Sequence, residues 1–181
     1  MRISIPDKLL KVADEILERG SVNLTKLTVL KKWFEPSHRL ASFAIFVAKR
    51  ASEQNGKITG EAAELFREAQ SLLAKLPDAH PVVNRREAKQ LYERLNAFQN
   101  EYVRQQWVPV RMIRNHYLFL VEEGLRIYLW RANSPSDGYR LAANYCENYD
   151  SQYGNSLNGP SYTKVQEIIR FIFTMEALET L

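Results

Sequence analysis

The seven prolines constrain the fold of this chain more than any other feature, because each falls between apolar segments and none within one. Proline breaks a helix interior but fits a first turn. The segments between the prolines repeat apolar residues every three or four positions, and none shows the sustained alternation of a strand. A length of 181 residues suits one domain. We therefore expect an all-α fold, a single-domain irregular helical bundle spanning residues 1–181.

About eight helices are expected, each bounded by prolines, glycines or capping residues. The third is apolar around most of its circumference, so we expect it at the centre of the fold. We expect Asn23, Ser37 and Asn84 to cap the second, third and fifth helices, since short polar side chains accept hydrogen bonds from first-turn N–H groups. The expected helices cover residues 6–19, 23–34, 37–54, 59–76, 84–102, 109–130, 136–148 and about 161 to the end.

The connection between the fifth and sixth helices is short and leaves two possibilities open. Either a tight turn reverses the chain at residues 107–109, or one long helix over residues 84–131 kinks at Pro109. We favour the kink, because no glycine or asparagine is present there to cap the first half.

Several classes of protein are excluded by composition. Cys146 is the only cysteine, so the sequence predicts no internal disulfide and no cysteine-based zinc site. The Glu35-x-x-His38 spacing is interrupted by Pro36, and we expect neither a metal nor a cofactor. The longest uncharged apolar run, residues 40–48, is far shorter than the roughly 20 residues of a membrane span. The first ten residues have no secretory apolar stretch. We expect a cytoplasmic protein with no membrane partner.

Positive charge is concentrated in two segments of a chain whose formal net charge is +4. Residues 21–50 carry six basic residues against Glu35 alone, and residues 85–116 carry seven against three acidic ones. Basic segments of this kind attract anionic partners such as nucleic acid, although many merely solvate the outer faces of helices. The first two expected helices also have the outline of a helix-turn-helix. The candidate nucleic-acid-binding residues are Lys26, Lys31, Lys32, Arg39, Arg85, Arg86 and Arg114.

One pair of residues suggests catalysis, but only weakly. Arg111 and His116 have the Arg-x4-His spacing found in some helical ribonucleases of the HEPN class. In a site of that kind the histidine would transfer protons and the arginine would hold the phosphate. Two residues match by chance often, and a histidine at the edge of a helix seam is the simpler interpretation. We expect the protein not to be an enzyme.

Tyrosines are concentrated after residue 116, where seven of the nine occur. Tyrosine is enriched at protein interfaces, because its ring is apolar and its hydroxyl stays hydrated. The same rings could instead lie at the half-buried edge of the core. The leading hypothesis is a non-enzymatic interaction module that binds a protein partner or a second copy of itself, and nucleic-acid binding is the alternative. The candidate partner-surface residues are Tyr139, Tyr145, Tyr149 and Tyr153.

Overall fold

The described part of the computed structural model is helical, which confirms the all-α prediction. The structure describes residues 30–54, 60–82, 84–106, 116–130, 134–146 and 162–181. The expected helix at 6–19 and most of the one at 23–34, including its Asn23 cap, lie outside these residues. Within them the chain forms seven helices: α2 (Leu30–Trp33), α3 (Ser37–Ser52), α4 (Gly60–Ala74), α5 (Arg85–Gln106), α7 (His116–Trp130), α8 (Pro135–Cys146) and α9 (Tyr162–Glu179).

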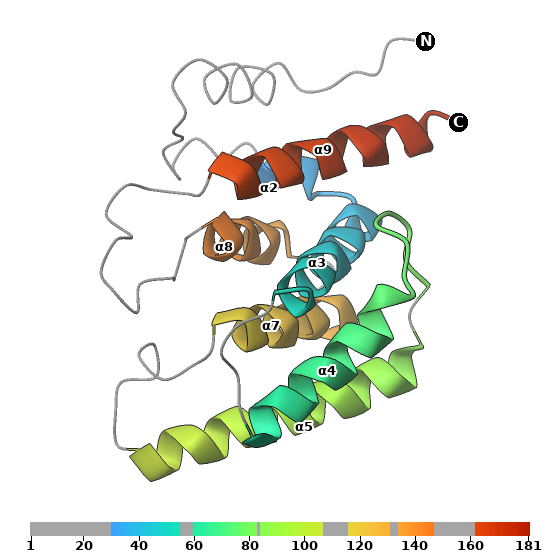
Figure 1. Cartoon of the computed structure of the whole chain (residues 1–181). Coiled ribbons are helices and arrows are strands. Elements are labelled where there is room, and N and C mark those ends of the chain that lie inside the picture. Colours follow the sequence, from blue (N-terminus) through green and yellow to red (C-terminus); the bar gives the residue numbers. More distant parts are fainter. Residues whose placement is uncertain (1–29, 55–59, 83, 107–115, 131–133, 147–161) are drawn as a thin grey trace.

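Helix α3 lies at the centre of the bundle, as its apolar circumference predicted. Every residue from Ser42 to Ala48 is buried, and α4, α7 and α8 all pack against α3. Figure 1 shows α9 and α2 along one side of the bundle, α4 and α5 along the opposite side, and α3, α7 and α8 between them. The predicted Ser37 cap is wrong: α3 begins directly after the extended residue Pro36, with no side-chain hydrogen bond to its first turn.

A glycine allows α3 and α7 to approach closely. A Cβ atom added at Gly124 of α7 would lie 2.5 Å from the Ala44 carbonyl oxygen and 2.9 Å from the Ala48 Cβ of α3. Both distances are shorter than a normal van der Waals contact, so only glycine fits this crossing. The neighbouring alanines contribute little bulk, and the two backbones therefore meet at the core.

Helices α5 and α7 form an antiparallel pair, so the preference for one kinked helix is wrong. Arg85, the first residue of α5, donates a hydrogen bond to the carbonyl of Leu129 near the end of α7. Further along α5, the Asn96 amide donates to Glu122 at 2.9 Å. The antiparallel pairing with α7, together with packing against α4, buries the apolar seam of α5. The connecting residues 107–115 lie outside the described residues.

The start of α5 follows the sequence prediction. The Asn84 side-chain oxygen accepts hydrogen bonds from the backbone N–H groups of Arg86 (3.0 Å) and Glu87 (3.5 Å). These contacts satisfy first-turn donors that have no partner inside the helix. In the described part of the chain, no helix is both long and apolar enough to cross a membrane.

Candidate interaction surface

An exposed indole marks the end of the bundle where α7 finishes and α5 begins. Trp130, the last residue of α7, is 52% exposed. Its ring packs edge-on against Tyr92 of α5, with the centroids 4.7 Å apart and the planes inclined at 69°. This geometry is a favourable aromatic arrangement, so the indole has a supported position while one side faces solvent. Single exposed apolar side chains are common, and the surroundings of Trp130 therefore decide its meaning.

Arg85 fixes the neighbouring part of the same surface. Its Nη2 donates to the Leu129 carbonyl at 2.6 Å, and its guanidinium carbon lies 5.4 Å from the centroid of the Tyr128 ring. A cation at the C-terminus of α7 satisfies a carbonyl that has no helical donor and opposes the negative end of the helix dipole. The contact with Tyr128 adds a cation–π attraction. The first turn of α5 is thereby held against the last turn of α7.

Two further exposed side chains are close to Arg85 in the sequence. Val82, just before the helix, is 88% exposed, and Arg86 in the first turn is also exposed. Among the described residues, Arg86 makes no ion pair. We use the name Trp130 surface for the set Val82, Arg85, Arg86, Tyr92, Tyr128 and Trp130. Tryptophan, tyrosine and arginine are the residues that most often dominate the binding energy of protein interfaces.

Those candidate nucleic-acid-binding residues that the structure describes do not merge into one patch. Lys31 lies over the Tyr139 ring, 4.9 Å from its centroid, and Lys32 is exposed on the same short helix α2. Arg85 and Arg86 lie on α5, on the opposite side of the bundle from α2 (Figure 1). Lys26 and Arg114 lie outside the described residues.

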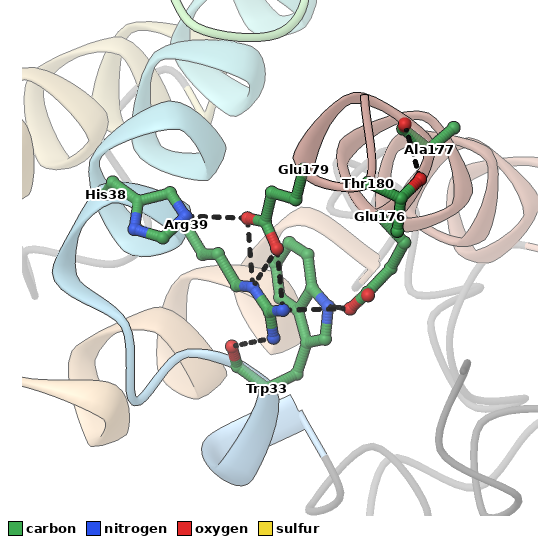
Figure 2. Close-up of polar contacts among 7 residues, drawn as sticks. All are labelled: Trp33, His38, Arg39, Glu176, Ala177, Glu179 and Thr180. Atoms are coloured by element: carbon green, nitrogen blue, oxygen red, sulfur yellow. Dashed lines mark hydrogen bonds and ion pairs between the residues drawn. The ribbon is translucent and has the colours of Figure 1, made fainter. Parts of the chain in front are cut away.

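Arg39 belongs to a network inside the fold, drawn in Figure 2. Its guanidinium pairs with Glu179 at 2.7 Å and with Glu176 at 3.2 Å, and it also donates to the Trp33 carbonyl at 3.2 Å. His38 Nε2 lies 2.6 Å from the Glu179 carboxylate. The charge of Arg39 is thus already balanced by two carboxylates.

The same network ties α9 to the corner between α2 and α3. The buried indole N–H of Trp33 donates to Glu176 at 2.6 Å, and the Arg39 guanidinium lies 5.1 Å from the indole centroid (Figure 2). Hydrogen bonds from Arg39, and then from His38, lower the pKa of Glu179 below its ordinary value. The Glu179 hydrogen bond also raises the pKa of Arg39, although burial opposes this. The network therefore stabilises the fold and leaves Arg39 poorly placed to reach a phosphate.

Tyr145 is buried, so its assignment to an exposed partner surface is wrong. Only 1% of this residue is accessible, and its hydroxyl donates to Glu167 of α9. Burial, followed by this hydrogen bond, raises the pKa of Tyr145 well above its ordinary value. The α8 face that carries Tyr145 is covered by α9. Tyr139 is half-buried beneath Lys31, while Tyr149 and Tyr153 lie outside the described residues.

His116, the first residue of α7, is in an environment that suits catalysis poorly. Burial, and secondarily the positive charge of Lys164, lowers its pKa from 6.5 to about 4. Its ring is therefore neutral at pH 7, and a base with so low a pKa accepts a proton weakly in general base catalysis. Arg111 lies outside the described residues, so its position relative to His116 stays a prediction. Cys146 is buried.

No cluster of three or more acidic, histidine or cysteine side chains suited to a metal ion occurs among the residues that the structure describes.

Sequence reasoning missed Trp130 and Tyr92, whose contact joins two helices. The position of Trp130 in the sequence could have indicated it, because this large aromatic residue lies where an apolar segment ends and the polar residues Arg131, Asn133 and Ser134 begin. No family model, no curated protein and no solved structure matches this chain.

Proposed function

We propose that this chain is a non-enzymatic interaction module that binds a protein partner through the Trp130 surface. The observation that carries the proposal is the exposed indole of Trp130, supported edge-on by Tyr92. A side chain that is fixed before binding loses little conformational entropy when a partner covers it. Burial of the exposed side of the indole would then give a large share of the binding energy.

The charge of the surface indicates the chemistry of the partner. Arg86 and Lys89 are exposed near the start of α5, the helix whose Tyr92 contacts the indole, and the ion pair of Lys89 with Glu93 is a long, solvent-exposed contact of 3.8 Å. We therefore expect a partner with an apolar pocket for Trp130 and carboxylates around its rim. Such charges raise the rate of encounter and select the orientation of binding more than they increase affinity.

The test compares Trp130→Ala with Leu178→Ala, a matched control that removes an exposed apolar side chain from α9. The readouts are sedimentation equilibrium for self-association and identification of crosslinked proteins for another partner. We expect Trp130→Ala to weaken the complex by about 30-fold, as for a typical hot spot, and Leu178→Ala to leave it unchanged. Equal behaviour of the two variants, or a wild-type chain that is monomeric and retains no protein, would refute the proposal.

The nucleic-acid alternative is separated by one further arm of this experiment. An exposed indole beside arginines can also stack on the bases of a single strand. Binding of a labelled single-stranded oligonucleotide, strengthened at low salt and abolished by Trp130→Ala, would assign the surface to nucleic acid instead. Unchanged oligonucleotide binding in Trp130→Ala would separate any such activity from this surface.

A further inference from the structure

A groove on another face of the molecule lies between α3, α9 and the loop after α4. It has a volume of about 460 Å³ and is partly open to solvent. This volume is within the range of sites for small organic molecules. Its lining residues come from α3 and the residues just after it, from the loop after α4 and from α9: Phe46, Arg50, Glu53, Gln54, Asp78, Glu167, Arg170, Phe171 and Thr174.

Ion pairs and ring contacts hold the side chains in the wall formed by α3. The Arg50 guanidinium pairs with Asp78 at 2.8 Å and with Glu53 at 3.1 Å, and it lies 5.4 Å from the centroid of the Phe46 ring. Phe46 in turn stacks on Phe171 of α9, with the ring centroids 4.6 Å apart. Two stacked aromatic rings, only 3% and 4% exposed, therefore connect the walls and present their edges at the base of the groove.

Each carboxylate in the lining already has a partner. Glu53 pairs with Arg50, and Asp78 pairs with both Arg50 and Lys49. Glu167 accepts the buried hydroxyl proton of Tyr145. The charges of Glu53 and Asp78 are therefore balanced by cations, which reduces the repulsion that an incoming anion would meet there, whereas Glu167 keeps its charge and is held against Tyr145.

Arg170 is the exception among the charged groups of the lining. It lies on α9, and its exposed side chain makes no ion pair or hydrogen bond with any part of the chain that the structure describes. One turn earlier on the same helix, Glu167 is held by Tyr145 of α8 and does not pair with Arg170. The groove thus contains a guanidinium whose five donors are available to a ligand.

We propose that this groove binds a small organic anion, whose carboxylate or phosphate group pairs with Arg170 while its apolar body lies over the edges of Phe46 and Phe171. A guanidinium suits both anions, because its parallel N–H groups match two oxygens of either group. The proposal is independent of the Trp130 surface, which lies on α5 and α7. Either proposal can therefore fail without the other.

The test is titration of the 15N-labelled full chain with phenyl phosphate, benzoate and inorganic phosphate at constant ionic strength. The amides of Gln54, Arg170 and Thr174 should shift saturably with phenyl phosphate, benzoate or both, and the stronger ligand identifies the preferred anionic group. Inorganic phosphate should bind about tenfold more weakly than phenyl phosphate, because it lacks the apolar body.

Arg170→Ala should weaken binding of phenyl phosphate or benzoate by about tenfold to a hundredfold, the value of a hydrogen-bonded charge pair. The matched control is Arg67→Ala, which removes an exposed arginine from α4, outside the groove. Both variants should retain the helical circular dichroism of the wild type. The absence of saturable shifts, equal affinities of the two variants, or equal affinities for phenyl phosphate and inorganic phosphate would overturn the proposal.

Discussion

The close approach of α3 and α7 at Gly124 makes Gly124→Ala a sensitive test of the packing. The variant adds one methyl group, which would lie 2.5 Å from the Ala44 carbonyl oxygen and 2.9 Å from the Ala48 Cβ. The first of these atoms belongs to the backbone of the central helix, which cannot rotate away as a side chain can. The two helices must therefore separate or the residue must distort.

Two opposing terms determine the size of the effect. Alanine is favoured over glycine within a helix by about 1 kcal/mol. An extra methyl group in a filled core usually costs about 1–3 kcal/mol, and the backbone contact favours the upper end of that range here. The difference predicts that Gly124→Ala lowers the free energy of unfolding by about 1–2 kcal/mol. For a chain of this length, that corresponds to a fall in Tm of about 2–8 °C.

Urea unfolding followed by circular dichroism measures the change directly. Ala97→Gly is the matched control, because Ala97 is exposed on α5 and its replacement reports the propensity term in this chain without a steric contribution. We expect this control to lose about 1 kcal/mol. A Gly124→Ala protein that is as stable as the wild type, or more stable, would refute the α3–α7 packing described above.

Two further predictions concern pH. The pKa of His116 falls from 6.5 to about 4 on folding. As the pH falls, His116 therefore becomes protonated in the unfolded chain before it does in the folded chain, and the fold loses stability between pH 6.5 and about 4. His116→Gln should reduce this loss between pH 6.5 and 4.5 by about 2 kcal/mol in urea titrations, and parallel profiles for variant and wild type would contradict it. The pKa of Glu179 is lower in the folded than in the unfolded chain. The carboxylate therefore stabilises the fold above its ordinary pKa, and this stabilisation is lost as the pH falls through the pKa of the folded state. Glu179→Gln should therefore lower the free energy of unfolding at pH 7 by up to about 1 kcal/mol, since its ion pair with Arg39 is partly solvated. The difference in stability between variant and wild type should shrink at pH 3. An undiminished difference at pH 3 would count against the network.

Features encoded by neighbouring residues could be predicted from the sequence. The central helix was expected at residues 37–54 and is observed at Ser37–Ser52, and the Asn84 cap is present. Apolar spacing and capping side chains act within a few residues, so a short stretch of sequence contains the whole signal. The Ser37 cap failed because the rigid, extended Pro36 occupies the position from which a side chain would have capped the helix.

Features that depend on distant contacts could not be predicted. The bond from Trp33 to Glu176 joins residues 143 positions apart, and those between Arg39 and Glu179 span 140 positions. Nothing near Arg39 in the sequence shows that its charge is balanced by the last helix. The burial of Tyr145 likewise depends on where α9 packs, and the pairing of Trp130 with Tyr92 depends on the chain reversal between α5 and α7.

The link between Trp33 and α9 also bears on the order of events during synthesis. Trp33 is synthesised before its indole N–H acceptor Glu176 and its ring partner Phe171, which follow more than a hundred residues later. Until α9 has emerged, the nascent chain must carry an unshielded tryptophan, and such surfaces promote aggregation. The contacts between the α2–α3 corner and α9 can therefore form only after α9 has been translated.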